Sequence, residues 1–282
     1  MRPFAVRSVR PVGESDRAAA LELCGRDPLA NCYVTARMDE VNLDRARGAL
    51  LGHYPRGRLE ALCWATANVI PVECGPQDAA AFGDRLRRHQ HRYSSVFGPS
   101  AQVSLLWEGL SHSWQEPLDV RPHQPLLAIG PEDPLGMAPD TRVRPARLEE
   151  LTEVVPAAAA MFTEEIGYPP YQDRAGEAAY RYAVQGLVVR KHCFVLVEDG
   201  RVVFKADIGS VGLGVAQIQG VWVAPDRRGE GLAAPAMARV VQLTRAEAPW
   251  VSLYVNDFNK AALRAYARVG FRQVGEFATI LF

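Results

Sequence analysis

The second half of the chain alternates short apolar runs with turn signals. Apolar runs at residues 193–198 and 201–208 flank Asp199-Gly200, a dipeptide that accepts the positive φ angles of a type I′ turn. A glycine-rich stretch at 209–214 is expected to turn the chain into a further strand over 217–223. The pattern therefore predicts a three-stranded antiparallel meander.

A helix, a strand and a second helix are predicted after the meander. Helical periodicity predicts a helix from about 232 to 246, and the apolar run at 250–255 predicts a strand. The next helix is expected to start at Asn259, a residue type that caps helix N-termini, and to end at Gly270. Two short strands complete the predicted sheet: residues 271–277 and 279–282.

The first half of the chain has a weaker pattern. Its apolar runs predict strands at 59–64 and 68–73 and a helix from 77 to about 91. Four basic residues lie near the end of that helix, and a basic helix face is usually a solvated one. They are Arg85, Arg87, Arg88 and His89.

A proline-rich connector separates the two halves. Between Trp114 and Thr141 there are six prolines and two glycines, interrupted by the apolar run 126–129. This density of helix breakers predicts a connector around one strand.

The two halves of the chain, one on each side of the connector, begin in the same way. The triplet Val-Arg-Pro starts at Val9 and again at Val143, followed by predicted helices near 16–23 and 148–162. We interpret this as a hypothesis of a diverged tandem duplication. The expected domains are an N-terminal α/β domain at 1–130, a linker at 131–140 and a C-terminal domain at 141–282.

Composition narrows the class of protein. The 282-residue chain is 48% hydrophobic, which is enough for two domains with their own cores. Its 32 basic and 32 acidic side chains give a formal net charge of zero, so no nucleic-acid partner is expected. Any binding to phosphate must be local.

The cysteines and the N-terminus show no sign of secretion. The five cysteines include no C-x-x-C pair and no histidine at metal-ligand spacing, so we expect neither disulfides nor a metal site. The first ten residues lack the apolar core of a signal peptide, and no segment has the roughly 18 apolar residues of a membrane-spanning helix. We expect a cytoplasmic protein with no membrane partner, and a homodimer stays open.

Residues 221–233 form the most specific motif of the chain. A β-branched run and a Pro-Asp turn lead into a cationic glycine loop at 227–231, and a helix is expected to start near Leu232. Because Gly229 and Gly231 have no Cβ, the backbone can curl until successive N–H groups point at one anion. This order predicts a pyrophosphate site.

The spacing Arg228-x-x-Gly231-x-Ala233 resembles the Arg/Gln-x-x-Gly-x-Gly/Ala loop of the GNAT superfamily of acyl-coenzyme A transferases. The resemblance extends from about 143 to 282. As a whole, the chain resembles the two-domain GNAT proteins of actinobacteria. It implies an α/β fold of the α+β type, with a central mixed, largely antiparallel, splayed sheet flanked by helices. The N-terminal half has no such glycine loop, so a GNAT-like repeat there is expected to have lost its cofactor site.

A second segment supports the resemblance. Residues 259–271 are similar to the Asn-x-x-Ala-x-x-x-Tyr-x-x-x-Gly-Phe segment of GNAT enzymes, in which the tyrosine lies beside the sulfur of the coenzyme. Ala262 and Tyr266 are four residues apart and therefore share a helix face. The resemblance implies that Tyr266 protonates the departing coenzyme A thiolate.

The resemblance further implies acetyl-coenzyme A as the acyl donor and direct attack by a primary amine, with no metal. Backbone amides from Arg228 to Ala233 would hold the pyrophosphate, while the strand edge at Trp222 and Val223 would pair with the pantetheine arm. The full set of expected cofactor contacts is Val221, Trp222, Val223, Arg227, Arg228, Gly229, Glu230, Gly231, Leu232, Ala233, Asn256, Asn259, Ala262 and Tyr266.

No general base is evident. Many GNAT enzymes place a glutamate on the strand before the glycine loop, where this chain has Gln217 and Gln219, amides that can contact substrate or orient water. The alternative catalytic candidates are Glu164 and Glu165, which lie beside aromatic residues and are ranked as substrate contacts first and base second. The acceptor amine stays open between a small molecule, a protein N-terminus and a lysine.

Other functions fit parts of the same pattern. Gly229-x-Gly231-x-x-Ala234 also matches a dinucleotide-binding fingerprint with Asp257 as the ribose acid, but the roughly 50 residues that follow are too few for a doubly wound sheet. A non-catalytic GNAT fold could instead sense acyl-coenzyme A or bind a protein partner. The presence of Tyr266 together with a complete glycine loop argues against that alternative.

An acyl-cysteine intermediate is also not expected. Cys193 is preceded by His192 at the start of a predicted strand. Neighbouring strand residues point to opposite faces, so the two side chains would not form a nucleophile–base pair.

Overall fold

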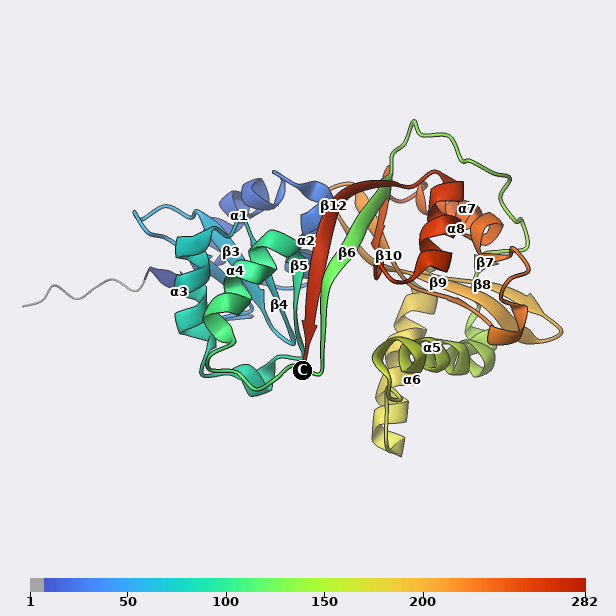
Figure 1. The fold of residues 1–282 in the computed structure, drawn as a ribbon, viewed down its shortest axis with the longest axis horizontal. Coiled ribbons are helices and arrows are strands. Elements are labelled where there is room, and N and C mark those ends of the chain that lie inside the picture. Colours follow the sequence, from blue (N-terminus) through green and yellow to red (C-terminus); the bar gives the residue numbers. More distant parts are fainter. Residues whose placement is uncertain (1–7) are drawn as a thin grey trace, which may run out of the picture. The chain divides into compact units, whose positions relative to one another are not determined.

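The computed structural model describes residues 8–282, which fall into two compact units (Figure 1). The first unit comprises the chain up to Leu126 together with Tyr254–Phe258 and Gln273–Phe282. The second comprises Leu127–Leu253 and Asn259–Arg272. Residues 1–7, which belong to the segment considered for a signal peptide, lie outside the described residues.

The first unit is a mixed sheet with helices on both faces. Its strand order is β1-β2-β3-β4-β5-β12-β6. The pairs from β1 to β4 are antiparallel, β4 and β5 are parallel, and β12 is antiparallel to β5. Its strands are β1 (Val9–Pro11), β2 (Leu50–His53), β3 (Ala61–Ala65), β4 (Asn68–Val72), β5 (Ser95–Pro99), β6 (Asp119–Ile129) and β12 (Arg272–Leu281).

Two apolar cores hold the helices of the first unit to opposite faces of its sheet. One core contains Phe82 of α3 and Leu106 of α4, and the other contains Leu23 of α1 and Met38 of α2. Their bounds are α1 (Arg17–Cys24), α2 (Pro28–Asp39), α3 (Pro76–Leu86) and α4 (Ser100–Leu110).

The second unit has the strand order β11-β10-β9-β8-β7. The pairs from β7 to β10 are antiparallel, and β10 and β11 are parallel. Helices α5 and α6 share an apolar core with β8 and β9, while α7 and α8 pack against each other. The elements are β7 (Arg144–Pro145), α5 (Leu151–Ile166), α6 (Arg174–Val189), β8 (Cys193–Glu198), β9 (Arg201–Gly212), β10 (Val215–Val223), α7 (Ala233–Thr244), β11 (Trp250–Tyr254) and α8 (Lys260–Val269).

Both halves of the chain have the same order of elements. From β1 to β6, and again from β7 to β12, the order is one strand, two helices, three strands, a helix, a strand, a helix and a strand. Within each half the first four strands pair antiparallel and the next pair is parallel. The first copy of the repeated triplet forms β1, and Arg144 and Pro145 of the second copy form β7. This order supports the tandem duplication.

The predicted meander is present. Asp199 and Gly200 have φ angles of 49° and 74°, as a type I′ turn requires, and join β8 to β9. The prediction of a turn over 209–214 was too long, because β9 continues to Gly212 and the chain reverses at Leu213-Gly214. The glycines at 209 and 212 are strand residues, and Gly209 lies at a register shift where Gln219 packs over it.

Three other predictions need correction. The strands expected at 271–277 and 279–282 form one strand, β12. The helix expected from 77 to about 91 ends at Leu86, and residues 90–92 form a 3₁₀ turn. The expected boundaries also assigned Tyr254–Phe258 and Gln273–Phe282 to the C-terminal domain. In the structure, both segments belong to the first compact unit.

Within residues 8–282, no helix has the length and apolar character that crossing a membrane requires.

Candidate functional site

The glycine loop between β10 and α7 has the backbone geometry of an anion cradle. Gly229 and Gly231 have φ angles of 84° and 82°, in the left-handed region that favours glycine, and nothing lies within 4 Å of where their Cβ atoms would be. Among the described residues, no acceptor takes a hydrogen bond from the amides of Gly231, Leu232 or Ala233. These N–H groups stand at the positive end of the α7 dipole, where an anion is stabilised.

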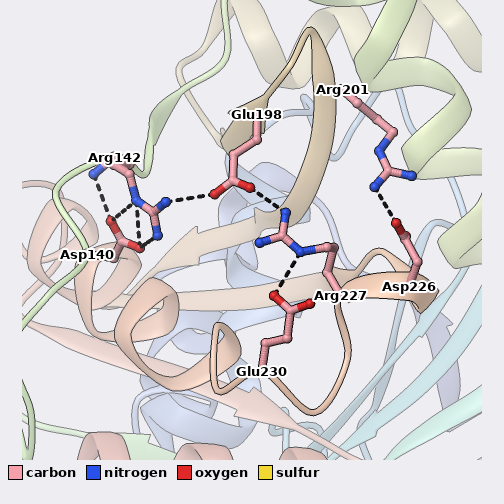
Figure 2. Close-up of polar contacts among 7 residues, drawn as sticks. All are labelled: Asp140, Arg142, Glu198, Arg201, Asp226, Arg227 and Glu230. Atoms are coloured by element: carbon pink, nitrogen blue, oxygen red, sulfur yellow. Dashed lines mark hydrogen bonds and ion pairs between the residues drawn. The ribbon is translucent and has the colours of Figure 1, made fainter.

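Arg227, one of the predicted cofactor contacts, is held by carboxylates (Figure 2). Its guanidinium hydrogen-bonds Glu198 and Glu230, and the pKa of Arg227 is raised first by the bond to Glu198 and then by the bond to Glu230. Glu198 also accepts a hydrogen bond of 2.7 Å from Arg142. The charge of Arg227 is therefore largely neutralised within the protein.

Arg228 is paired as well. Its Nη2 donates to Glu164 Oε2 at 2.5 Å, and its Nε donates to the Val223 carbonyl at 3.0 Å. The other oxygen of Glu164 accepts a hydrogen bond of 3.1 Å from Trp222 Nε1. Glu164, predicted as a substrate contact or base, therefore ties the end of α5 to the predicted cofactor loop.

Strand β10 separates from β11 close to this loop. In the described part of the chain the two strands pair only from Val215↔Trp250 to Gln217↔Ser252. Beyond Gln217 the edge of β10 that faces β11 is unpaired, and it includes Val221, Trp222 and Val223. These are the residues that the sequence predicted to pair with a pantetheine arm.

Tyr266 lies buried on α8. Asn259 caps this helix by accepting a hydrogen bond of 3.1 Å from the Ala262 amide, and Gly270 ends it with a φ of 112°. The Tyr266 ring packs edge-on against Phe271 at 5.9 Å between centroids, and the residue is 6% exposed. Burial first, and then the charge of Glu165, raises the pKa of the Tyr266 phenol, which keeps it neutral.

The two predicted glutamates therefore have different surroundings. Glu164 contacts the glycine loop, whereas the charge of Glu165 acts on Tyr266.

The two glutamines of β10 also differ. Gln217 is 6% exposed and its Nε2 has no hydrogen-bond partner in the described chain, while Gln219 is exposed and folds over Gly209. Gln217 pairs in register with Ser252 of β11, whose Oγ is likewise without a partner. Two buried polar side chains without a partner in the described chain therefore lie in register where the strands diverge.

Asn256 belongs to the first unit, whereas the other predicted cofactor contacts belong to the second. Its Oδ1 accepts a hydrogen bond of 2.8 Å from Gln124, which in turn accepts one of 2.6 Å from Thr279. This network joins Asn256 to β6 and β12, so its side-chain oxygen already has a partner.

The corresponding helix start in the first unit carries a carboxylate. Helix α3 follows β4 as α7 follows β10, but its N-terminus is capped by a carboxylate: Asp78 Oδ2 accepts the Gly75 amide at 2.9 Å. The second oxygen of Asp78 lies 2.6 Å from Nδ1 of the buried His53. A negative side chain already occupies the end of the helix dipole, so a phosphate there would be repelled.

Cys193 is not placed as a nucleophile. It is completely buried, and burial first, then the charge of Asp207, raises the pKa of its thiol. His192 pairs with Glu247 at 2.9 Å instead. Among the described residues there is also no group of three or more histidine, cysteine or acidic side chains that could hold a metal ion.

One buried charged pair escaped the sequence analysis. Lys205 and Asp207 form an ion pair on β9, with 1% and 4% of their surfaces exposed. Their sequence signal was two charges at i and i+2 in an otherwise apolar strand, which places both on one face.

Family comparisons divide the chain near its middle. Residues 158–271 match the "Acetyltransferase (GNAT) family", and residues 48–154 match a domain of unknown function, DUF4081. No curated protein matches the chain.

Solved structures of similar fold span nearly the whole chain. A GCN5-related N-acetyltransferase from Sphaerobacter thermophilus has a TM-score of 0.62 at 18% identity, covering 96% of this chain and 94% of that chain. A GNAT acetyltransferase from Colwellia psychrerythraea has a TM-score of 0.56 at 15% identity, covering 97% and 99%. A tandem GNAT protein from the clavulanic acid biosynthesis pathway has a TM-score of 0.51 at 12% identity, covering 96% and 97%. At these identities the likeness shows the fold.

Proposed function

We propose that this acyltransferase, whose residues 158–271 form a GNAT acetyltransferase domain, moves the acetyl group of acetyl-coenzyme A directly to a primary amine. The main support is the glycine loop, where two left-handed glycines and three amides without protein acceptors stand at the start of α7. Such a loop fits the pyrophosphate of coenzyme A, because it supplies several donors to one anion without a side chain in the way.

The arrangement of the second unit fits the rest of an acyl-coenzyme A molecule. The unpaired edge of β10 at Trp222 and Val223 offers backbone donors and acceptors for the amides of the pantetheine arm. Of the remaining predicted contacts, Asn259 caps α8 about two turns before Tyr266, and Ala262 lies one turn before it. Arg227 and Arg228 would contribute mainly through the backbone, since their side chains are paired with carboxylates.

Tyr266 is our candidate for the acid that protonates the departing thiolate. Its phenol is buried and held neutral, as a proton donor must be. Burial makes the phenol a weaker acid than it is in water. The same apolar surroundings also raise the proton affinity of the thiolate, so the pKa values of the two groups stay matched.

The acceptor amine is proposed to enter between α5 and β10. Glu165, whose charge acts on Tyr266, is placed to attract a cationic amine, and the exposed Gln219 offers a polar contact. Glu164 is less suited to either role, because both of its oxygens already accept hydrogen bonds from Arg228 and Trp222.

A screen of thiol release tests this function. The purified full chain is incubated with acetyl-coenzyme A and a panel of amines, amino acids and peptides, and free coenzyme A is measured against a reaction without acceptor. Amine-dependent release with acetylated product by mass spectrometry is the expected result. Tight binding of acetyl-coenzyme A without turnover on any acceptor would favour a sensor, and binding of NADH alone would contradict the transferase.

A further inference from the structure

A cavity of about 380 Å³, the α5 cavity, lies between helix α5 and the adjoining ends of strands β9 and β10. All of its lining residues belong to the second unit, and neither Tyr266 nor any residue of the glycine loop at 227–231 is among them. Its volume falls within the range of sites for small organic molecules. The cavity is therefore a candidate site for a ligand other than the acyl donor.

Small and apolar side chains keep the α5 cavity open. Ala157 lines it from α5, and Val202 and Ala224 line it from the sheet. These three residues are buried, whereas Pro156 and Pro225, which also line the cavity, are exposed to solvent. The cavity thus combines buried apolar walls with exposed ones, so a molecule can enter it from solvent.

Thr152 and Glu153, in the first turn of α5, add hydrogen-bond acceptors to the lining. Pro156 has no N–H, so it cannot donate to the Thr152 carbonyl as a residue four positions along a helix normally does. Glu153 Oε2 accepts a hydrogen bond of 2.8 Å from the Thr152 hydroxyl, and no cation pairs with Glu153 among the described residues. The other two charged residues of the lining, Arg201 and Asp226, pair with each other at 2.6 Å (Figure 2). The α5 cavity therefore carries one uncompensated negative charge.

Trp222 supplies an aromatic wall. Its side chain packs against the apolar core that α5 and α6 share with the sheet, and it lines the cavity as well. An aromatic face attracts cations and also packs against hydrocarbon. With the charge of Glu153 beside it, this lining is complementary to an ammonium ion that carries an apolar group, and it disfavours an anion.

Trp222 also connects the α5 cavity to the glycine loop. Its Nε1 donates to Glu164 Oε1 at 3.1 Å, and Glu164 Oε2 accepts a hydrogen bond of 2.5 Å from Arg228. A ligand packed against the indole restricts the motion of the ring and so stabilises its bond to Glu164. Arg228 then stays paired with Glu164 and is less available to an anion in the glycine loop.

We propose that the α5 cavity is a regulatory site for an organic ammonium ion with an apolar body, whose binding weakens the binding of acetyl-coenzyme A at the glycine loop. The regulatory effect rests on the proposed function. Because coupling between two sites is reciprocal, acetyl-coenzyme A weakens the binding of the ammonium ion by the same factor. Glu164 and Arg228 are both more than 40% exposed, so solvent limits the coupling to roughly two- to fivefold.

Benzyltrimethylammonium is a suitable probe, because its quaternary nitrogen has no lone pair and cannot take an acetyl group as an acceptor would. Its binding is followed by the indole N–H resonance of Trp222 in nitrogen–proton NMR spectra of the full chain. The chain has five tryptophans, and the resonance that is lost in Trp222→Phe identifies the right one. The probe should shift this resonance, whereas phenylacetate, an anion with the same ring, should not.

Two variants test where the probe binds. Glu153→Gln removes the uncompensated charge and should weaken binding by about threefold or more. Ala160→Phe fills the cavity from α5 and should abolish binding. The matched controls are Glu149→Gln, in the turn before α5, and Ala178→Phe, on the exposed surface of α6, which should bind the probe as the wild type does. Melting temperatures show that each variant is folded.

Calorimetry of acetyl-coenzyme A binding at saturating probe measures the coupling. The Kd should rise roughly two- to fivefold for the wild type and should not change for Ala160→Phe. Glu164→Gln retains only one side-chain oxygen, so it cannot accept from both Trp222 and Arg228. In that variant the probe should still shift the Trp222 resonance but leave the Kd of acetyl-coenzyme A unchanged.

A probe that leaves Trp222 unshifted, or that binds Ala160→Phe as tightly as the wild type, overturns the site. A shift of Trp222 without a change in the wild-type Kd of acetyl-coenzyme A overturns the regulatory role. A chain that binds no acetyl-coenzyme A overturns the proposed function, and the regulatory role with it. The shift of Trp222, which needs no donor, distinguishes that failure from a cavity that binds nothing.

Discussion

Glu164 of α5 and Arg228 of the glycine loop form an ion pair of 2.5 Å between carboxylate and guanidinium. The pair joins the first motif position of the loop to the end of a helix 64 residues earlier. Because Trp222 also donates to Glu164, the carboxylate contacts the strand edge and the loop together. In the proposed function, a pyrophosphate would bind next to a cation that the protein itself has neutralised.

We expect Glu164→Gln to tighten the binding of acetyl-coenzyme A. The substitution removes a negative charge beside the loop and frees Arg228 to face an anion. Both side chains are more than 40% exposed, so solvent screens the effect, and a two- to fivefold lower Kd by calorimetry is expected. Glu177→Gln, on the exposed surface of α6, should leave the Kd unchanged. An unchanged Kd with a collapse of kcat would instead assign Glu164 as a base.

Gly231→Glu should abolish binding of acetyl-coenzyme A. The side chain introduces a negative charge among the amides of the cradle, and the residue must also adopt a φ of 82°, at a cost of about 1–2 kcal/mol. Gly200→Ala serves as the control, because Gly200 has a φ of 74° with open space around its Cβ position. It should lower the melting temperature without affecting binding. Undiminished binding by the Gly231 variant would mean that the loop has been misassigned.

Much of the second unit follows from local sequence chemistry. The turn at Asp199-Gly200, the cap at Asn259 and the left-handed Gly270 each depend on one residue type at one position, and all three were predicted. The glycine loop belongs to the same class, since its conformation depends on Gly229 and Gly231 themselves. Signals of this kind need no knowledge of tertiary contacts.

Contacts between distant segments could not be predicted in this way. The pairing of β12 with β5 and the bond between Gln124 and Asn256 depend on which strands meet, and residue type does not specify that. The same holds for Glu164, whose partner Arg228 is 64 residues away. Lys205 and Asp207 read as ordinary strand charges until the fold shows that both are buried.

Tyr266→Phe should lower kcat by roughly 10²-fold or more while leaving the Kd for acetyl-coenzyme A unchanged, as expected for loss of a positioned acid. Burial first, and then Glu165, raises the pKa of this phenol, so the acid stays protonated as the pH rises. Wild-type kcat should therefore show no decline from tyrosine ionisation between pH 8 and about 10. Tyr182→Phe on the exposed face of α6 is the control. A Phe variant with normal turnover reduces Tyr266 to a packing residue.

We expect one molecule of acetyl-coenzyme A to bind per chain. Two repeats of one element order would allow two sites, but the N-terminus of α3 is capped by the Asp78 carboxylate, whereas that of α7 has free amides. Titration calorimetry of the full chain should give a stoichiometry of one, and Gly231→Glu should reduce it to zero. A second site retained in that variant would show that the first unit binds the donor too.

The stability of the first unit should depend on pH through Glu14. Hydrogen bonds from Arg17 first, and then from the Leu43 amide, lower the pKa of Glu14 from 4.5 to about 2. Because the folded state prefers the ionised carboxylate, this stabilisation is complete above about pH 5 and is lost as the pH falls through 4.5 toward 2. Glu14→Gln should lower the melting temperature at pH 7, and the difference from wild type should shrink toward pH 3. The control Glu22→Gln, on the exposed side of α1, should have no such pH dependence. If the melting temperature of Glu14→Gln stays below that of wild type by the same amount from pH 7 to pH 3, the destabilisation comes from packing instead of charge.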